Sequence, residues 1–114
     1  MSDCLFCKMV AKEIVPDVVY ENDHVLAFRD INPQAPTHIL VIPKEHISTI
    51  NDLDPEHAHV MGQLFLAAKK VAELEGLSES GYRCVVNCNR DAGQTVFHIH
   101  MHVLGGRGLT WPPG

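Results

Sequence analysis

Three histidines alternate with apolar residues in positions 97–104, which read Phe-His-Ile-His-Met-His-Val-Leu. Successive side chains of an extended strand point to opposite faces, so His98, His100 and His102 are expected to share one face. Neighbouring imidazoles would then be spaced about 6.6 Å along the strand, and the apolar residues between them would enter a core. Imidazole is the side chain best suited to nucleophilic, acid–base and metal-ligand roles near neutral pH. The pattern therefore indicates a site of chemistry.

A purely structural interpretation competes with this one. A single histidine on a strand is commonly a half-exposed polar residue, and two in alternation can arise by chance among the 8 histidines of the chain. Three in strict alternation between Phe97 and Val103 are not explained in this way. A zinc ion held by all three is a further alternative. The remaining histidines of no evident pattern, expected on the solvated surface, are His24, His57 and His59.

Cys4 and Cys7 form a pair of candidate metal ligands near the N-terminus. Their i, i+3 spacing places both thiols on one helical turn, as in structural zinc sites, although redox pairs and chance also produce it. We expect no signal peptide, so the 4 cysteines favour metal binding or burial over disulfides. Cys84 and Cys88 would lie about 13 Å apart in an extended strand, too far for one metal ion. We expect a buried thiol and a loop thiol there.

Length and composition fit one domain, which we place at residues 1–114. Hydrophobic residues at 46% and charged residues at 20% are typical of soluble globular proteins. No apolar run approaches the roughly 20 residues of a membrane span. The formal charge of −5 argues against binding of nucleic-acid polymers, whose phosphates need a basic surface, but permits one small nucleotide. A cytoplasmic location without a membrane partner is expected.

The elements that position these residues follow from capping and periodicity. A short helix through about Lys12 is expected after Asp3 as its N-cap. The main helix is expected to begin at Asp54, with Pro55 in its first position, and to end at Gly76. Its apolar stripe is predicted to comprise Val60, Met61, Leu64, Phe65, Ala68, Val71 and Ala72.

Five strands complete the predicted fold. They are expected at residues 18–21, 24–29, 38–43 and 82–87 and in the histidine segment. The segment 38–43 is apolar throughout, which favours a central strand. The order helix, three strands, helix, two strands predicts an α+β fold with a mostly antiparallel sheet of about five strands, one long helix and one short N-terminal helix.

The segment 98–104 resembles the signature of the histidine triad (HIT) family, His-φ-His-φ-His-φ-φ with φ apolar, and matches it completely. Residues 30–38 resemble the nucleoside-binding segment of the family, 42–46 the strand end after it, and 93–97 the run before the triad. Residues 104–107 and 111–114 resemble the Hint branch, the histidine triad nucleotide-binding proteins. The resemblance covers nearly the whole chain and implies the HIT-like fold.

The resemblance also implies catalytic roles. In the family the middle histidine attacks the α-phosphorus of a nucleotide, which implies a nucleotidyl-histidine intermediate on His100. His102 would contact the phosphate and, when protonated, stabilise its charge. His38 would orient His100 and relay protons. Thr95, where many relatives carry serine, would pass a proton to a departing amine.

Further residues are implied to hold the nucleotide. Asp30 would accept from the ribose hydroxyls, Ile31 would pack on the base, and Gln94 would reach the phosphate and the leaving group. Taken singly these are ordinary strand-end and turn residues, so only their joint match supports the assignment. The complete implied set is Asp30, Ile31, Asn87, Gly93, Gln94, Thr95, His100 and His102.

Some relatives bind structural Zn²⁺ through a cysteine pair and two histidines. The resemblance therefore implies a closed tetrahedral Cys₂His₂ site formed by Cys4, Cys7, His46 and His98. This assignment gives His98 a task separate from catalysis. A catalytic zinc ion on all three triad histidines is disfavoured, because it would occupy His100.

The implied activity is hydrolysis of purine nucleoside 5′-phosphoramidates, with an AMP-like ligand and no organic cofactor. Two alternatives stay open: a dinucleoside polyphosphate (Ap₄A-type) hydrolase, and a nucleotide-binding regulatory module with incidental turnover. Relatives are homodimers that join two sheets edge to edge, which also removes an exposed strand edge. A homodimer is therefore expected, with the tail around Trp111 reaching toward the partner's site.

Overall fold

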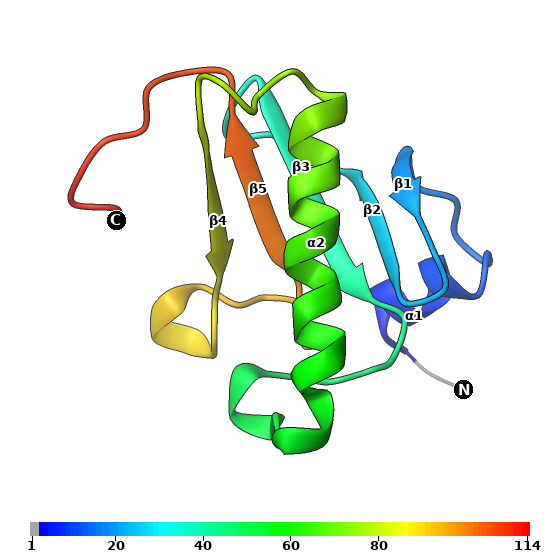
Figure 1. Cartoon of the computed structure of the whole chain (residues 1–114). Helices are drawn as coiled ribbons and strands as arrows, with labels where there is room; N and C mark the ends of the chain where they lie inside the picture. Colours follow the sequence, from blue (N-terminus) through cyan, green and yellow to red (C-terminus); the bar gives the residue numbers. More distant parts are fainter. Residues whose placement is uncertain (1–2) are drawn as a thin grey trace.

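Five strands pair into one antiparallel sheet in the computed structural model, which describes residues 3–114 (Figure 1). They are β1 (Val18–Glu21), β2 (Val25–Arg29), β3 (Thr37–Pro43), β4 (Tyr82–Val86) and β5 (Met101–Gly105), in the spatial order β1-β2-β3-β5-β4. The helices are α1 (Leu5–Val10) and α2 (Ala58–Leu74), and short 3-10 turns lie at η1 (Ile50–Asp52), η2 (Pro55–His57) and η3 (Arg90–Ala92). This confirms the predicted α+β fold. Neither helix of the described residues has the length and apolar character that a membrane crossing requires.

Side chains cap the start of α1 and of the 3-10 turn η2, which leads into α2. Cys4, and not the predicted Asp3, is the N-cap of α1, and its Sγ accepts a hydrogen bond from the Cys7 N–H over 3.4 Å. Asp54 acts as an N-cap as predicted, although the first turn after it is the 3-10 turn η2. His57, expected on the solvated surface, is partly buried with 17% of its side chain exposed, and its Nδ1 accepts from the Asp54 N–H over 3.1 Å.

The end of α2 is fixed by Gly76, as the sequence predicts. Its φ of +74° favours glycine, and its N–H donates to the Glu73 carbonyl. The Leu77 N–H donates to the Ala72 carbonyl over 2.8 Å, which completes a Schellman motif. Leu77 then packs so closely on β5 that a Cβ at Gly105 would lie 2.7 Å from its Cδ1. The C-terminus of α2 is thereby held against the sheet.

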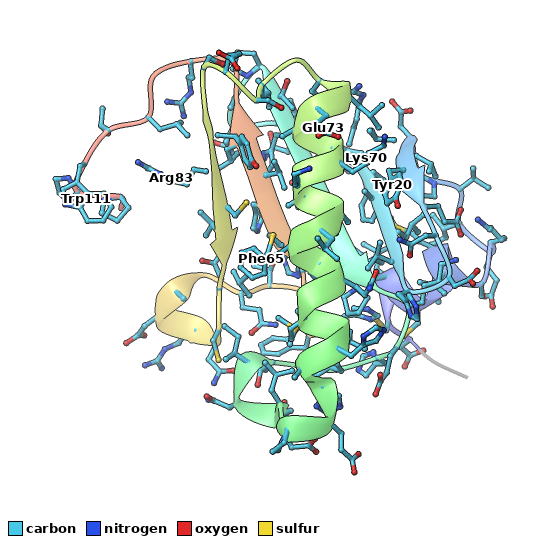
Figure 2. The ribbon with its side chains drawn as sticks, in the orientation of Figure 1. Tyr20, Phe65, Lys70, Glu73, Arg83 and Trp111 are labelled. Carbon is cyan, nitrogen blue, oxygen red and sulfur yellow. The ribbon has the colours of Figure 1, made fainter. Side chains whose placement is uncertain are left out.

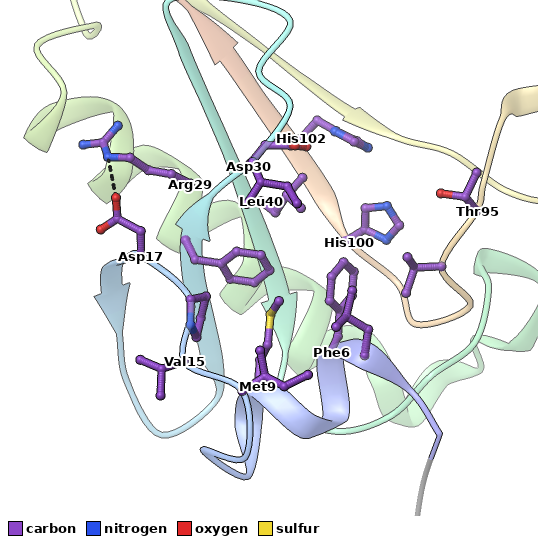
Figure 3. A pocket seen from close by; sticks show the side chains of 16 residues that line it. Phe6, Met9, Val15, Asp17, Arg29, Asp30, Leu40, Thr95, His100 and His102 are labelled. Carbon is purple, nitrogen blue, oxygen red and sulfur yellow. Dashed lines mark ion pairs between the residues drawn. The ribbon is translucent and has the colours of Figure 1, made fainter.

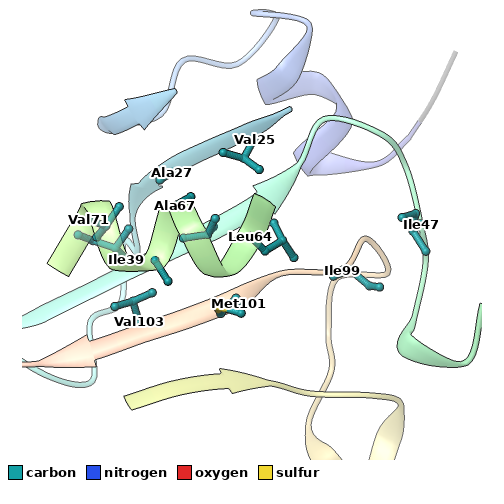
Figure 4. Close-up of a cluster of buried hydrophobic side chains, with 12 residues drawn as sticks. Val25, Ala27, Ile39, Ile47, Leu64, Ala67, Val71, Ile99, Met101 and Val103 are labelled. Carbon is teal, nitrogen blue, oxygen red and sulfur yellow. The ribbon is translucent and has the colours of Figure 1, made fainter. Parts of the chain in front are cut away.

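The sheet is covered on both faces, which explains why β3 is buried along its whole length. One face packs under α2 and forms the larger core (Figure 4), made of Val25, Ala27, Ile39, Val41, Ile47, Leu64, Ala67, Ala68, Val71, Ile99, Met101 and Val103. The opposite face packs Phe6 of α1 on Leu26, Phe28, Leu40 and Ile42. The two helices therefore lie on opposite sides of the sheet.

The predicted apolar stripe of α2 is wrong at Phe65. This side chain is 59% exposed, and Ala67 occupies a core position instead. Phe65 lies about 100° around the helix from the buried Leu64, beyond the sector that faces the sheet. Leu66 is also exposed, at 61%. Together with Leu74, which is 53% exposed, three large apolar side chains of α2 face away from the core.

The histidine segment alternates as predicted, but it joins the ladder only at Met101, where β5 begins. The backbone groups of even-numbered residues along β3 form their hydrogen bonds with β2. Two bonds at the ends of the pairing show this: the Asp30 N–H donates to the His38 carbonyl, and the Lys44 N–H donates to the His24 carbonyl. Odd-numbered residues therefore face β5, and there Pro43 has no N–H to donate. The ladder stops two residues before Pro43, at the pair of Val41 and Met101.

Candidate active site and metal centre

A pocket of about 770 Å³ opens on the α1 side of the sheet (Figure 3). Apolar residues of α1 and the sheet form much of its wall, among them Leu5, Phe6, Met9, Phe28 and Leu40. Five of the residues predicted to serve catalysis or nucleotide binding line the same pocket, namely Asp30, Ile31, Thr95, His100 and His102. The fold therefore brings the triad segment and the segment after β2 together around one cavity.

The ring of His100 is held in one tautomer by the backbone. Its Nδ1 lies 2.8 Å from the carbonyl oxygen of His98, and a carbonyl oxygen only accepts hydrogen bonds. Nδ1 therefore carries the proton, and neutral His100 keeps an unprotonated Nε2. The side chain is 8% exposed and lines the pocket. This arrangement presents the lone pair of Nε2 as the nucleophilic atom.

A hydrogen-bonded relay fixes the neighbouring histidines. The Gln34 N–H donates to Nδ1 of His38 over 3.0 Å, so neutral His38 carries its proton on Nε2. That Nε2 lies 2.9 Å from Nδ1 of His102 and 3.4 Å from Oδ2 of Asp30. His38 thus donates to His102, which in turn carries its own proton on Nε2. His102 is therefore arranged as a hydrogen-bond donor.

Burial keeps this relay neutral. Desolvation lowers the pKa of His38, against the opposing effect of the Asp30 carboxylate. The pKa of His102 is lowered to about 4, by burial first and then by His100 and His38, while Asp30 raises it. Both rings are therefore neutral near pH 7 before a ligand enters.

The sequence predicts that His38 orients His100, and the structure places its hydrogen bond on His102 instead. The ring centroids of His102 and His100 are 5.1 Å apart, so His38 acts on His100 through a packed ring. Asp30, His38 and His102 also gather three candidate metal-ligand atoms. However, the Nε2 of His38 that faces this cluster carries a proton, which makes it a donor and not a ligand. We interpret the cluster as a relay.

Gln94 differs from its predicted role. Gln94 is 6% exposed, and its side-chain amide forms all its hydrogen bonds with backbone groups. Oε1 accepts from the Asn89 N–H, and Nε2 donates to the carbonyls of Ser48 and Val96. Gln94 therefore braces the loop that carries Thr95 into the pocket. Among the described residues, Asn87 and Gly93 likewise lie outside the pocket lining, whereas Thr95 is part of it.

Sequence reasoning missed the contribution of α1 to the site. The apolar side of this helix was visible as Leu5, Phe6, Met9 and Val10, but such spacing normally marks a helix packed on a core. In the structure Phe6 does pack on the core, and it also contacts the ring of His100 in a T-shaped arrangement with centroids 5.1 Å apart. No sequence pattern distinguishes these two uses of an apolar helix face.

A second cluster lies beside the pocket and contains the four predicted zinc ligands, Cys4, Cys7, His46 and His98. The Sγ of Cys4 is 3.4 Å from Nδ1 of His98, and the Sγ of Cys7 is 3.2 Å from Nδ1 of His46. The two Nδ1 atoms are 3.2 Å apart. Ligands around a tetrahedral zinc ion with ordinary bond lengths are separated by about 3.4–3.8 Å. The donor set therefore fits zinc in both chemistry and spacing.

The second nitrogen of His98 fixes which of its atoms can bind a metal. Nε2 donates to the Pro43 carbonyl over 2.8 Å, so Nδ1 is unprotonated and faces the two cysteines. Burial lowers the pKa of His98, which favours the neutral, ligating form. Ser48 Oγ lies 3.3 Å from Nε2 of His46. Both imidazoles are thus oriented by groups outside the cluster.

Comparisons with known proteins agree with this geometry. A purine nucleoside phosphoramidase of Escherichia coli (strain K12) is 53% identical, over 94% of this chain and 90% of that protein. A 14 kDa zinc-binding protein of Zea mays is 51% identical, over 99% of this chain and 89% of that protein. The crystal structure of a HIT family hydrolase from Legionella pneumophila Philadelphia 1 superposes with a TM-score of 0.96 at 56% identity, covering 98% of this chain and 100% of the other. The HIT domain model matches residues 11–109. The chain therefore belongs to the histidine triad family.

Proposed function

We propose that this protein is a hydrolase of purine nucleoside 5′-phosphoramidates and that residues 1–114 act as one HIT domain. The observation that carries the proposal is the tautomer of His100, whose unprotonated Nε2 is presented at the pocket by the bond from Nδ1 to the His98 carbonyl. The similarity to the phosphoramidase of Escherichia coli supports the same activity. The apolar wall suits a purine base, and Asp30 at its rim suits a ribose.

The proposed reaction proceeds by two displacements at phosphorus. The Nε2 lone pair of His100 attacks the phosphorus, and the bond from phosphorus to the amine breaks, with its electron pair passing to the amine nitrogen. The Thr95 hydroxyl donates its proton to this nitrogen and takes one from solvent water, so that the leaving group departs as the neutral amine. Water then attacks the phosphorus, the bond to Nε2 breaks, and the nucleoside monophosphate leaves. His102 donates from Nε2 to a phosphoryl oxygen, which stabilises the charge that develops there.

We further propose that Cys4, Cys7, His46 and His98 bind structural Zn²⁺. The ligand spacing and the orientation of both imidazoles support this, and a similar protein of Zea mays is named for zinc binding. A bound zinc ion would supply cross-linking only, because all four protein ligands close its coordination shell. The ion would connect α1 to the segments after β3 and before β5.

A homodimer formed at the β4 edge of the sheet is the proposed assembly, in the cytoplasm and without nucleic-acid or membrane partners. β4 is the last strand of the sheet, so one of its edges is unpaired. Figure 2 shows Phe65 projecting from α2 on the side toward β4, and its 59% exposure leaves an apolar surface there. Trp111 is 81% exposed in the tail beyond β4, where a partner would cover it.

Replacing the nucleophile tests the activity. We expect wild-type protein to hydrolyse adenosine 5′-phosphoramidate, and His100→Ala to lose at least about 10³-fold in kcat because no covalent step remains. His24→Ala, which lies outside the pocket lining, should retain full activity. Preferential cleavage of Ap₄A would instead identify a polyphosphate hydrolase. Binding of AMP with no turnover of either substrate would identify a regulatory module.

The protonation of His102 can be followed by imidazole NMR. Since burial lowers its pKa to about 4, below the ordinary 6.5, the ring should stay neutral in free protein as pH falls from 7.5 to 5.5. Saturating AMP should raise this pKa, because a phosphate dianion stabilises the imidazolium. Asp30→Asn should lower it further, since the carboxylate raises it. A charged His102 in free protein at pH 6.5 would contradict this account.

Metal content tests the zinc proposal. Wild-type protein should contain about one zinc ion per chain, and chelation should lower its melting temperature by roughly 10 °C, because binding to the folded state is lost. Cys7→Ser should bind zinc at least about tenfold more weakly. Cys88→Ser, which removes a thiol outside the cluster, should retain full zinc content. Equal zinc content in both variants would refute the assignment.

Sedimentation equilibrium tests the assembly. Wild-type protein should be dimeric at micromolar concentration, and Phe65→Glu should shift it toward monomer because a charge enters an apolar contact. Leu74→Glu is a matched control: Leu74 is 53% exposed on the same helix but points about 180° away from Phe65. A monomeric wild type, or equal effects of both substitutions, would rule out this interface.

A further inference from the structure

Phe6 occupies a position that neither zinc binding nor the phosphorus chemistry accounts for. It lies on α1 and is only 3% exposed. Its ring makes T-shaped contacts with His98 and His100, with centroids 5.8 Å and 5.1 Å apart, and with Phe28 at 5.6 Å. One aromatic ring thus packs at the same time on a metal-ligand candidate and on the proposed nucleophile. Figure 3 shows Phe6 beside His100.

The helix that carries Phe6 is too short to be stable alone. α1 has 6 residues, fewer than an isolated helix needs in water. Phe6 packs on the sheet together with the partly buried Met9 and Val10. Cys4 and Cys7, which flank Phe6, add contacts to the rings of His98 and His46. A zinc ion bound by these four ligands would therefore hold the turn of α1 that contains Phe6 against the sheet.

Two contacts restrain the ring of His100 in addition to its packing on His102. The hydrogen bond from Nδ1 to the His98 carbonyl fixes the tautomer, and the packing of Phe6 limits rotation of the ring. The same turn of α1 supplies Leu5 and Phe6 to the pocket wall. If α1 were released, His100 would lose a packing partner and the pocket would lose part of one wall.

We propose that Phe6 is a positioning residue that couples zinc occupancy to the nucleophile and to nucleotide binding. This inference rests on the proposed function of the same pocket. Zinc bound to the cysteine pair holds Phe6 against His100, and loss of the ion releases both. Because coupling between two binding sites is reciprocal, a nucleotide must tighten zinc binding by the same factor by which zinc tightens nucleotide binding.

The test compares wild type with Phe6→Leu. Val10→Ala serves as the control, because Val10 lies on the same helix and packs on the same cluster but is outside the pocket lining. AMP affinity is measured by calorimetry for zinc-loaded and chelated protein, and zinc affinity by chelator competition with and without AMP. In wild type and Val10→Ala, zinc should tighten AMP binding by about 10-fold, and AMP should tighten zinc binding equally. In Phe6→Leu the coupling should fall below about 2-fold while zinc stoichiometry is unchanged. In turnover, Phe6→Leu should lower kcat more than it raises KM.

Imidazole NMR of His100 without nucleotide provides a second readout. Chelation should shift its ring signals in wild type and change them much less in Phe6→Leu, whose ring is already released. If AMP does not bind zinc-loaded wild type at all, the proposed function fails, and the NMR result alone decides the coupling. Unchanged His100 signals after chelation overturn the inference. Zinc affinity that is independent of bound AMP, or equal coupling in Phe6→Leu and wild type, overturns it as well.

Discussion

The absence of one amide hydrogen at the end of β3 governs how the histidines are used. Pro43 faces β5 but cannot donate to it, so the ladder ends at the pair of Val41 and Met101. Freed from the ladder, the Pro43 carbonyl accepts from Nε2 of His98 instead. That bond turns Nδ1 of His98 toward the cysteines. The His98 carbonyl lies outside the ladder and accepts from Nδ1 of His100. A backbone constraint thereby separates the proposed metal ligand His98 from the proposed nucleophile His100, two residues away.

Backbone groups, rather than other side chains, assign the protons of these rings. The Pro43 and His98 carbonyls each require an N–H, and the Gln34 N–H requires a lone pair. His38, His98 and His100 therefore each have one nitrogen fixed by a group that cannot change its protonation, and the other is left for chemistry. The proton of His102 is placed in turn by the hydrogen bond from His38. Burial then keeps His38 and His102 neutral, so the arrangement survives across the physiological pH range.

Much of this architecture follows from local sequence. The alternation in residues 97–104 predicts which side chains enter the core, because Ile99, Met101 and Val103 do lie under α2. Hydrogen-bond partners that lie far apart in the sequence could not be predicted from local patterns. The partner of His38 depends on strand register, and the inward turn of Gln94 depends on which carbonyls the loop leaves unpaired. The apolar spacing of α2 predicts Phe65 in the core, but spacing alone does not show how much of the helix surface the sheet covers.

The same separation of tasks explains why a six-residue helix belongs to the site. A pocket built on a flat sheet face needs a wall, and α1 supplies one with Leu5, Phe6 and Met9. Burial of Phe6 alone contributes only a few kcal/mol, which is small beside the conformational entropy of ordering such a segment. A metal ion bound by Cys4 and Cys7 together with His46 and His98 would offset that cost by cross-linking the helix to the sheet. The candidate metal centre and the pocket therefore both depend on the docking of one short helix.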